Sequence, residues 1–223
     1  MIKWEGKTLS EYVRAGQFEP YAKDVVDRVK EYIINKEVID AGCGPGNISV
    51  ALSEYAYKVI GIDTQTKAIE YAKELYSDVK NLSFKVGDIF DLESNSCDVL
   101  FGVSIGMIDK KNLELIRIPR EYLIFVNTLK SQYFPKRNHN EYDDTILNNG
   151  NYKYETFRLS TSFGQPFLNY DEAVDFIRRH NLSDDYEKFA KENIKEISSE
   201  YPLYLENKKN IQITVIESKN YGR

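Results

Sequence analysis

Hydrophobic residues in the first half of the chain alternate between short continuous runs and helical spacings. In the segment 21–34, Val25, Val29 and Ile33 recur on one face, which predicts a helix. Similar spacing predicts helices over 46–55 and 67–76. A short buried strand is predicted at 37–40, and further strands are predicted at 58–63, 82–86, 98–103 and 121–126. Strands separated by helices indicate βαβ units, so we expect an α/β fold with a doubly wound, mostly parallel sheet.

The second half of the chain has a different pattern. The polar stretch 128–150 is typical of a loop or insertion, and 152–163 predicts a long strand. Asn169 is expected to cap a helix that runs to His180, with Glu172 as its capping-box partner. Further helix is predicted over 183–199, and the alternation over 211–217 predicts a last, partly exposed strand.

One strand of the first half ends in an acid that is followed at once by a glycine-rich turn. The run Val38-Ile39-Asp40-Ala41-Gly42-Cys43-Gly44-Pro45-Gly46 places the carboxylate of Asp40 just before this turn. Glycines let the backbone bend sharply and bring its N–H groups close to a ligand. The helix that follows would add the positive end of its dipole.

Two later acids fit a nucleotide-like ligand at the same place. Asp63 ends the second strand, at the distance along the chain where an acid can accept both ribose hydroxyls. Asp88 follows the third strand and so belongs to the same carboxyl edge of the sheet. Ligands of open α/β sheets bind in the crevice at that edge.

Two cofactors compete for this arrangement. Dinucleotide proteins use the spacing G-x-G-x-x-G, whereas this chain has G-x-G-x-G preceded by Asp40. A carboxylate beside the turn would repel a pyrophosphate, but it would attract the ammonium and sulfonium groups of S-adenosylmethionine (SAM). An NAD-dependent oxidoreductase is therefore the less favoured interpretation.

The residues 21–127, about half of the chain, resemble the cofactor half of class I SAM-dependent methyltransferases. The resemblance implies a Rossmann-like sheet of seven strands with helices on both faces and an antiparallel last strand. It also implies one methyltransferase domain over 1–223, in which 1–127 binds SAM and 128–223 lies on the substrate side.

The resemblance assigns roles to individual residues. The methionine part of SAM would lie along the turn glycines, Asp63 would bind the ribose hydroxyls, and Asp88 would face the adenine. The full set of expected cofactor residues is Asp40, Gly42, Gly44, Gly46, Asp63, Thr64, Asp88, Ile89, Val103, Ser104 and Ile105. In this family the N-terminal segment often closes over SAM, and Tyr12, Phe18 and Tyr21 are candidates for that role, although helix packing explains them equally well. The turn Ile118-Pro119-Arg120 departs from the glycine pair that many members carry.

A small molecule is the favoured methyl acceptor. The segment Gly102-Val103-Ser104-Ile105-Gly106 lacks the Asn/Asp-Pro-Pro-aromatic turn of enzymes that methylate amide or base nitrogens, and no Pro-Cys pair is present. A net charge of −5 also disfavours a nucleic acid partner. A fold of this kind that binds SAM without catalysis is the main alternative.

The sequence shows no strong catalytic residue. It need not show one, because methyl transfer requires a general base only if the acceptor must lose a proton. His139 is a weak candidate for that base. Lys136, Arg137 and Arg158 could bind an anionic substrate, although surface charge is the commoner explanation. No metal site is expected, while magnesium held by carboxylates stays open.

Compartment and assembly follow from general features. The chain shows neither an apolar run of the ~20 residues that cross a bilayer nor the apolar core of a signal peptide at 1–10. Cys43 and Cys97 do not suggest a disulfide framework. We therefore expect a cytoplasmic protein without membrane contact, either a monomer or a homodimer.

Overall fold

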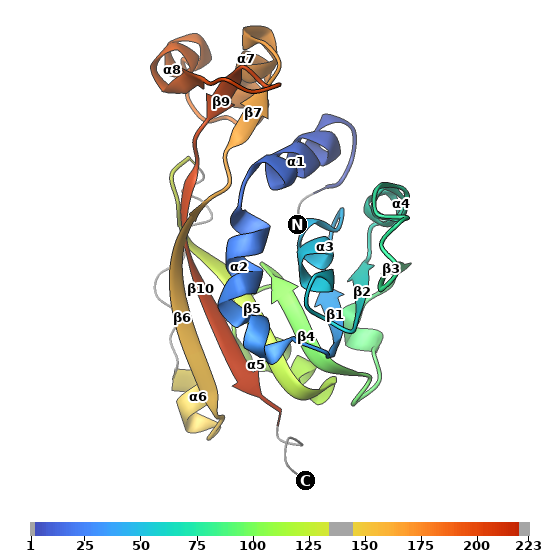
Figure 1. The fold of residues 1–223 in the computed structure, drawn as a ribbon. Coiled ribbons are helices and arrows are strands. Elements are labelled where there is room, and N and C mark those ends of the chain that lie inside the picture. Colours follow the sequence, from blue (N-terminus) through green and yellow to red (C-terminus); the bar gives the residue numbers. More distant parts are fainter. Residues whose placement is uncertain (1–2, 134–144, 219–223) are drawn as a thin grey trace.

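The computed structural model describes residues 3–133 and 145–218. Its centre is a seven-stranded sheet with the order β3-β2-β1-β4-β5-β10-β6 (Figure 1). The strands of this sheet are β1 Glu37–Ala41, β2 Lys58–Asp63, β3 Leu82–Val86, β4 Cys97–Val103, β5 Pro119–Ser131, β6 Tyr154–Ser162 and β10 Lys208–Glu217.

Strand directions confirm the predicted fold class. The strands β1 to β5 pair in parallel, whereas β10 is antiparallel to both of its neighbours, β5 and β6. The last strand of the chain therefore inserts between β5 and the edge strand β6. The parallel strands end at a common edge, where the loops after β1, β2, β3 and β4 meet.

Helices cover both faces of the sheet. On one face, Val25 and Val29 of α2 and Leu52 of α3 pack against the sheet at no measurable exposure. On the other face, Leu115 and Leu147 pack against strands β1, β4, β5 and β10. The elements of these two layers are α1 Lys7–Phe18, α2 Tyr21–Val29, η1 Lys30–Tyr32, α3 Asn47–Ser53, α4 Thr66–Leu75, η2 Ile89–Asp91, α5 Lys110–Leu113, η3 Glu114–Arg117 and α6 Thr145–Asn149.

A small lobe stands beyond the common edge of the main sheet (Figure 1). Its own three-stranded sheet has the order β7-β9-β8 and is packed with helices α7 and α8 around Phe167, Phe176 and Leu205. The elements of this lobe are β7 Gln165–Phe167, α7 Tyr170–Arg179, α8 Tyr186–Asn193, β8 Ile194–Glu196 and β9 Leu203–Leu205. Helix α1 contacts β7, so the lobe is joined to the N-terminal helical layer.

Asn169 caps α7 as expected, because its side chain accepts a hydrogen bond of 2.9 Å from the backbone N–H of Glu172. The reciprocal half of the capping box does not form. The carboxylate of Glu172 instead accepts from the N–H of Leu168 and pairs with Arg14 of α1. This residue thus connects α7 with α1 rather than closing the cap.

Three expectations about the second half are wrong. The helix predicted over 183–199 ends at Asn193, because 194–196 forms strand β8 beside β9. The stretch 128–150 is not all loop, since β5 continues to Ser131 and 145–149 forms α6. The last strand is buried rather than partly exposed, because β5 and β6 flank it on both sides, and Gln212 and Thr214 are each only 2% exposed. The assignment of 1–223 to one domain stays a prediction.

Candidate cofactor site

The glycine turn after β1 adopts a backbone that other residues rarely take. Gly42, Gly44 and Gly46 have φ angles of +66°, +53° and +89°. The space beside all three is also filled: a Cβ on Gly44, for example, would lie 2.8 Å from a ring carbon of Trp4, and a Cβ on Gly42 would lie 3.0 Å from Ile105. The turn therefore requires glycine both for its dihedral angles and for close approach.

Asp63 ties this turn to the end of β2. Its carboxylate accepts hydrogen bonds of 2.9 Å from the N–H groups of Gly44 and Gln65. The backbone N–H groups of Gly42 and Cys43 bond the carbonyl of Ile62, at 2.8 and 3.1 Å. Asp63 is 8% exposed, so a carboxylate lies directly beside the glycine turn at the common strand edge. The sequence-based placement of the two features in one site is thus seen in the structure.

Asp40 lies under the turn and not on its surface. It is 1% exposed, and the hydroxyl of Ser49 in α3 donates to its Oδ2 at 2.6 Å. Burial raises the pKa of Asp40 to about 7, the hydrogen bond from Ser49 lowers it in part, and the negative charge of Asp63 raises it further. Near neutral pH this carboxyl therefore exchanges a proton easily, and a nearby cation would stabilise its charged form.

Trp4 covers the glycine turn, and its role is not predicted from the sequence. Its backbone N–H donates to the side-chain oxygen of Gln65 at 2.9 Å, and its ring packs edge-on against Tyr12 at 4.8 Å. Tyr12 in turn contacts Phe163, with 5.1 Å between ring centroids. A lone tryptophan in a polar N-terminal segment carries no periodic signal, so only the close packing on Gly44 reveals it.

The aromatic residues expected near the cofactor divide into two groups. Tyr12 lies beside Trp4 and therefore close to the turn, while Tyr21 is buried against Phe163 at 5.3 Å. Phe18 is directed to the small lobe, where its ring lies 5.6 Å from that of Tyr204. Tyr12 is thus placed beside the turn, whereas Phe18 and Tyr21 contact rings farther along the chain. Closure of this segment over SAM stays a prediction.

A family model described as "Methyltransferase domain" matches residues 34–149, just over half of the chain. The match includes the glycine turn, Asp63 and Asp88. The chain belongs to this methyltransferase family.

Relatives of the chain agree with this assignment. Their names indicate different methyl acceptors. The chain is 33% identical over 86 residues, 37% of its length, to phosphoethanolamine N-methyltransferase 1 of Caenorhabditis elegans. It is 42% identical over 59 residues, 26% of its length, to an uncharacterized RNA methyltransferase of Clostridium acetobutylicum. The chain spans only 18% and 13% of the lengths of these two relatives.

A solved structure confirms the fold of this chain. Magnesium protoporphyrin IX methyltransferase from Synechocystis PCC 6803, solved with bound SAM, superposes with a TM-score of 0.54. The superposition covers 97% of this chain and 87% of that chain at 16% identity. The class I architecture inferred from the sequence is thereby confirmed.

The remaining predicted cofactor residues of the chain lie at or just after the ends of β2, β3 and β4. Thr64 is exposed beside Asp63, and exposed Asp88 caps η2 by accepting from the N–H of Phe90 at 3.0 Å. Ile89 is half-buried in η2. After Val103, Ser104 takes a left-handed backbone, with φ of +56°, and its N–H bonds the carbonyl of Val126 at 2.8 Å. The roles assigned to these residues stay predictions.

The turn before β5 replaces the glycine pair of many relatives with other contacts. Pro119 begins β5, and the guanidinium of Arg120 bonds Asp98 and Glu37, each at 2.8 Å. These ion pairs join the starts of three strands of the sheet. The departure therefore lies at the opposite end of β4 and β5 from the glycine turn.

Several other sequence-based candidates take no part in the described site. His139, Lys136 and Arg137 lie outside the described residues, and Arg158 is exposed on the edge strand β6. Over 3–133 and 145–218, no three His, Cys, Asp or Glu side chains are grouped so that they could hold a metal ion. Cys43 and Cys97 are free and buried. No helix in the described part of the chain is long and apolar enough to cross a membrane.

Proposed function

We propose that this chain transfers a methyl group from SAM to a small-molecule acceptor. The observation that carries the proposal is the hydrogen bond from the N–H of Gly44 to Asp63. It fixes a carboxylate beside a turn whose glycines leave no room for side chains. A cradle of this kind suits an adenosyl amino acid, because the backbone can approach the ligand while the acid accepts hydroxyl groups.

The residues of the site suit different parts of the cofactor. The methionine part of SAM would lie against the backbone of Gly42 and Gly44, and Asp63 would accept hydrogen bonds from the ribose hydroxyls. Asp88 would face the adenine with Ile89 beside it. Asp40 would act on the ammonium group through the turn, because its buried carboxyl has a pKa near neutrality and gains charge when a cation is close.

SAM supplies an electrophilic methyl carbon on a sulfonium, and the transfer leaves a neutral thioether. The chain must then orient an acceptor in line with that carbon, which can supply a large part of the rate enhancement. Val103, Ser104 and Ile105, at the end of β4, would border the transferring methyl group. The rings of Tyr12 and Phe163 would form part of the acceptor side and exclude water there.

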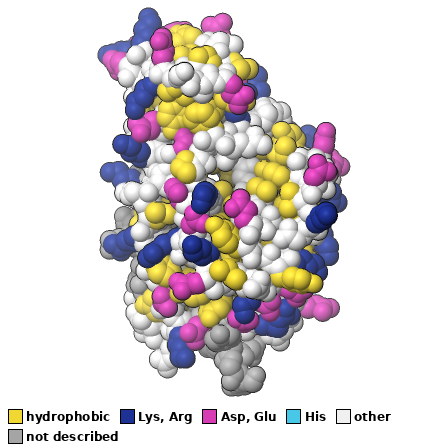
Figure 2. Space-filling view, viewed as in Figure 1, with side chains coloured by type: hydrophobic (Ala, Val, Ile, Leu, Met, Phe, Trp, Pro, Cys, Tyr) yellow, Lys and Arg dark blue, Asp and Glu magenta, His cyan; other side chains and the backbone are white. Residues whose placement is uncertain are grey.

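The surface charge supports a small acceptor over a nucleic acid. The chain carries a net charge of −5, and a protein that binds a phosphate backbone usually presents a basic face. On the face shown in Figure 2, acidic side chains lie among the basic ones. The cytoplasmic location and the monomeric or homodimeric state stay predictions.

The proposal is tested with SAM that carries a labelled methyl group. The protein is incubated with this SAM and, separately, with a pool of small metabolites and with total RNA. We expect label in the metabolite fraction, and we expect Asp63→Ala to abolish that transfer. Label only in RNA would contradict the acceptor class. Binding of SAM without transfer to either pool would favour a non-catalytic binding module.

A further inference from the structure

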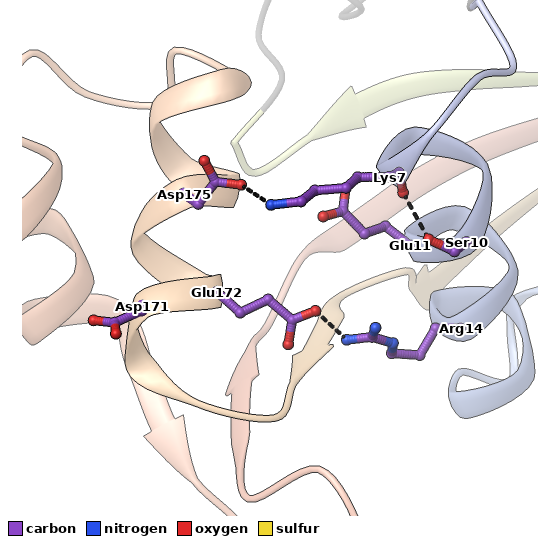
Figure 3. Close-up of a pocket in the computed structure, with 7 residues that line it drawn as sticks. All are labelled: Lys7, Ser10, Glu11, Arg14, Asp171, Glu172 and Asp175. Atoms are coloured by element: carbon purple, nitrogen blue, oxygen red, sulfur yellow. Dashed lines mark hydrogen bonds and ion pairs between the residues drawn. The ribbon is translucent and has the colours of Figure 1, made fainter.

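A cavity lies between helix α1 and helix α7, on the side of α1 that faces the small lobe. Its volume is about 480 Å³. Figure 3 shows side chains from both helices extending into the gap between them. The residues that line this α1–α7 cavity include Lys7, Ser10, Glu11 and Arg14 of α1 and Glu172 and Asp175 of α7.

Two ion pairs span the cavity and occupy most of its charged groups. Lys7 bonds Asp175 at 2.9 Å, and Arg14 bonds Glu172 at 2.7 Å (Figure 3). Arg179 of α7 reaches both Asp175, at 2.9 Å, and Glu11. Each cation of the lining therefore already has a carboxylate partner.

Glu11 differs from the other acids of the cavity. Its side chain is only 4% exposed, and one carboxylate oxygen accepts from Arg179. The other oxygen, Oε2, is buried and has no hydrogen-bond partner, which makes it the one such side-chain atom in the described part of the chain. Burial raises the pKa of Glu11, which Arg179 only partly offsets. An acceptor buried without a donor is costly, so this atom is poised to accept from a ligand.

The unpartnered carboxylate oxygen of Glu11 favours a positively charged hydrogen-bond donor as that ligand. The lining contains four carboxylates, on Glu11, Asp171, Glu172 and Asp175, and the two cations Lys7 and Arg14. Arg178 and Arg179 also bond these acids, so the opposite charges around the cavity are equal in number. Asp171 points away from α1 in Figure 3. Its negative charge therefore acts on a ligand in the cavity only at a distance, without a direct contact. A carboxylate with one oxygen already on a guanidinium can bind an ammonium through the other, and such charge-assisted bonds are stronger than neutral ones.

We propose that the α1–α7 cavity binds a small organic amine, whose ammonium group donates to Oε2 of Glu11. Ser10 can offer a second acceptor, because its hydroxyl donates to the carbonyl of Lys7 and retains its lone pairs. The site is separate from the glycine turn, since Glu11 and Tyr12 leave α1 in different directions. Tyr12 packs on Trp4, whereas Glu11 bonds Arg179.

Calorimetric titration of the whole chain with putrescine, a four-carbon diamine, tests this proposal at low salt. The matched neutral probe is 1,4-butanediol, which has the same carbon chain with hydroxyl groups in place of the amines. We expect saturable binding of putrescine and none of the diol. Equal binding of both probes, or binding of neither, would overturn the proposal.

Three variants locate the ligand within the cavity. Glu11→Gln should weaken putrescine at least ~10-fold, because it removes the charged acceptor. Lys7→Met should instead strengthen binding, by roughly twofold or more, since it removes a competing cation that is largely exposed. Asp171→Asn is the matched control: it removes one carboxylate that points away from the gap, so affinity should change less than about twofold.

The opposite effects of two variants keep the test independent of folding defects. A loss of structure in Glu11→Gln would be seen as a lower melting temperature, whereas Lys7→Met can only strengthen binding if the amine occupies the cavity. Unchanged affinity in both variants would place the putrescine elsewhere and contradict the proposal. Binding of S-adenosylhomocysteine, measured on the same samples, reports separately on the proposed function.

Discussion

Gly44 combines a left-handed backbone with direct packing under the ring of Trp4. Gly44→Ala should destabilise the protein by about 2 kcal/mol, since the new Cβ strains the backbone and displaces the indole. Urea unfolding measures this loss. Gly87→Ala is the matched control, because its φ is not left-handed and its Cβ would meet Ile62 at an ordinary 3.6 Å. Equal losses in both variants would contradict the packing described for the turn.

Asp40 gives the molecule a characteristic pH dependence. Its pKa is raised to about 7 in the folded state, while an unfolded aspartate titrates near 3.9. Between these values the folded state holds a proton that the unfolded state releases, so stability falls as pH rises from about 4 to 7. Asp40→Asn should remove this loss. The free energy of unfolding of the variant, relative to that of the unmutated protein, should therefore increase by roughly 1 kcal/mol for each pH unit between about 4 and 7.

Asp98 provides the control for this pH series. Burial raises the pKa of Asp98, but Arg120 and the N–H of Glu37 together lower it further, so the net shift is downward. Asp98 is therefore ionised in both folded and unfolded states above pH ~5. The stability difference of Asp98→Asn should therefore be flat from pH 5 to 8 in urea unfolding. A flat difference for Asp40→Asn as well would show that Asp40 is not buried as described.

At the scale of elements, the N-terminal segment before α1 is the cover of the glycine turn. Trp4 is the one tryptophan of the sequence, so its fluorescence reports on this contact alone. We expect S-adenosylhomocysteine to change the emission of Trp4 with saturation, because a ligand at the turn must contact or displace the indole. Unchanged emission during binding that calorimetry detects would place the ligand away from Trp4.

The predicted elements match the structure where one local pattern decides each of them. The strands at 58–63 and 82–86 lie between helical segments, and both were predicted with their observed bounds. The predicted helix over 183–199 failed because 194–196 pairs as strand β8 with the next strand along the chain, β9, and this sheet pairing overrides local propensity. The turn glycines and Asp63 could be placed from spacing alone, whereas Trp4 and the buried position of Asp40 depend on tertiary packing.

At the scale of the whole molecule, Glu19 joins the helical layer to the start of the small lobe. It is 8% exposed, and its carboxylate accepts from the N–H of Gly164 at 3.2 Å and from the hydroxyls of Ser162 and Tyr204. Glu19→Ala should cost about 3 kcal/mol, because it leaves three donors without their acceptor. Hydrogen exchange should show faster exchange in β7 and β9.

Exposed Glu70 of α4 is the control for this effect, and Glu70→Ala should change stability by less than about 0.5 kcal/mol. If Glu19→Ala left both the stability and the exchange of the lobe unchanged, the lobe would be held by its apolar contacts alone.

The function proposed for this chain requires that the glycine turn and Asp63 form the site of an adenosyl amino acid. Calorimetric titration with S-adenosylhomocysteine, compared between the unmutated protein and Asp63→Ala, measures this most directly, with NAD as the competing ligand and exposed Asp91→Ala as control. We predict saturable binding, a loss of at least ~10-fold in Asp63→Ala, and little change in the control. Saturable binding of NAD without binding of S-adenosylhomocysteine, or equal affinity in Asp63→Ala, would contradict it.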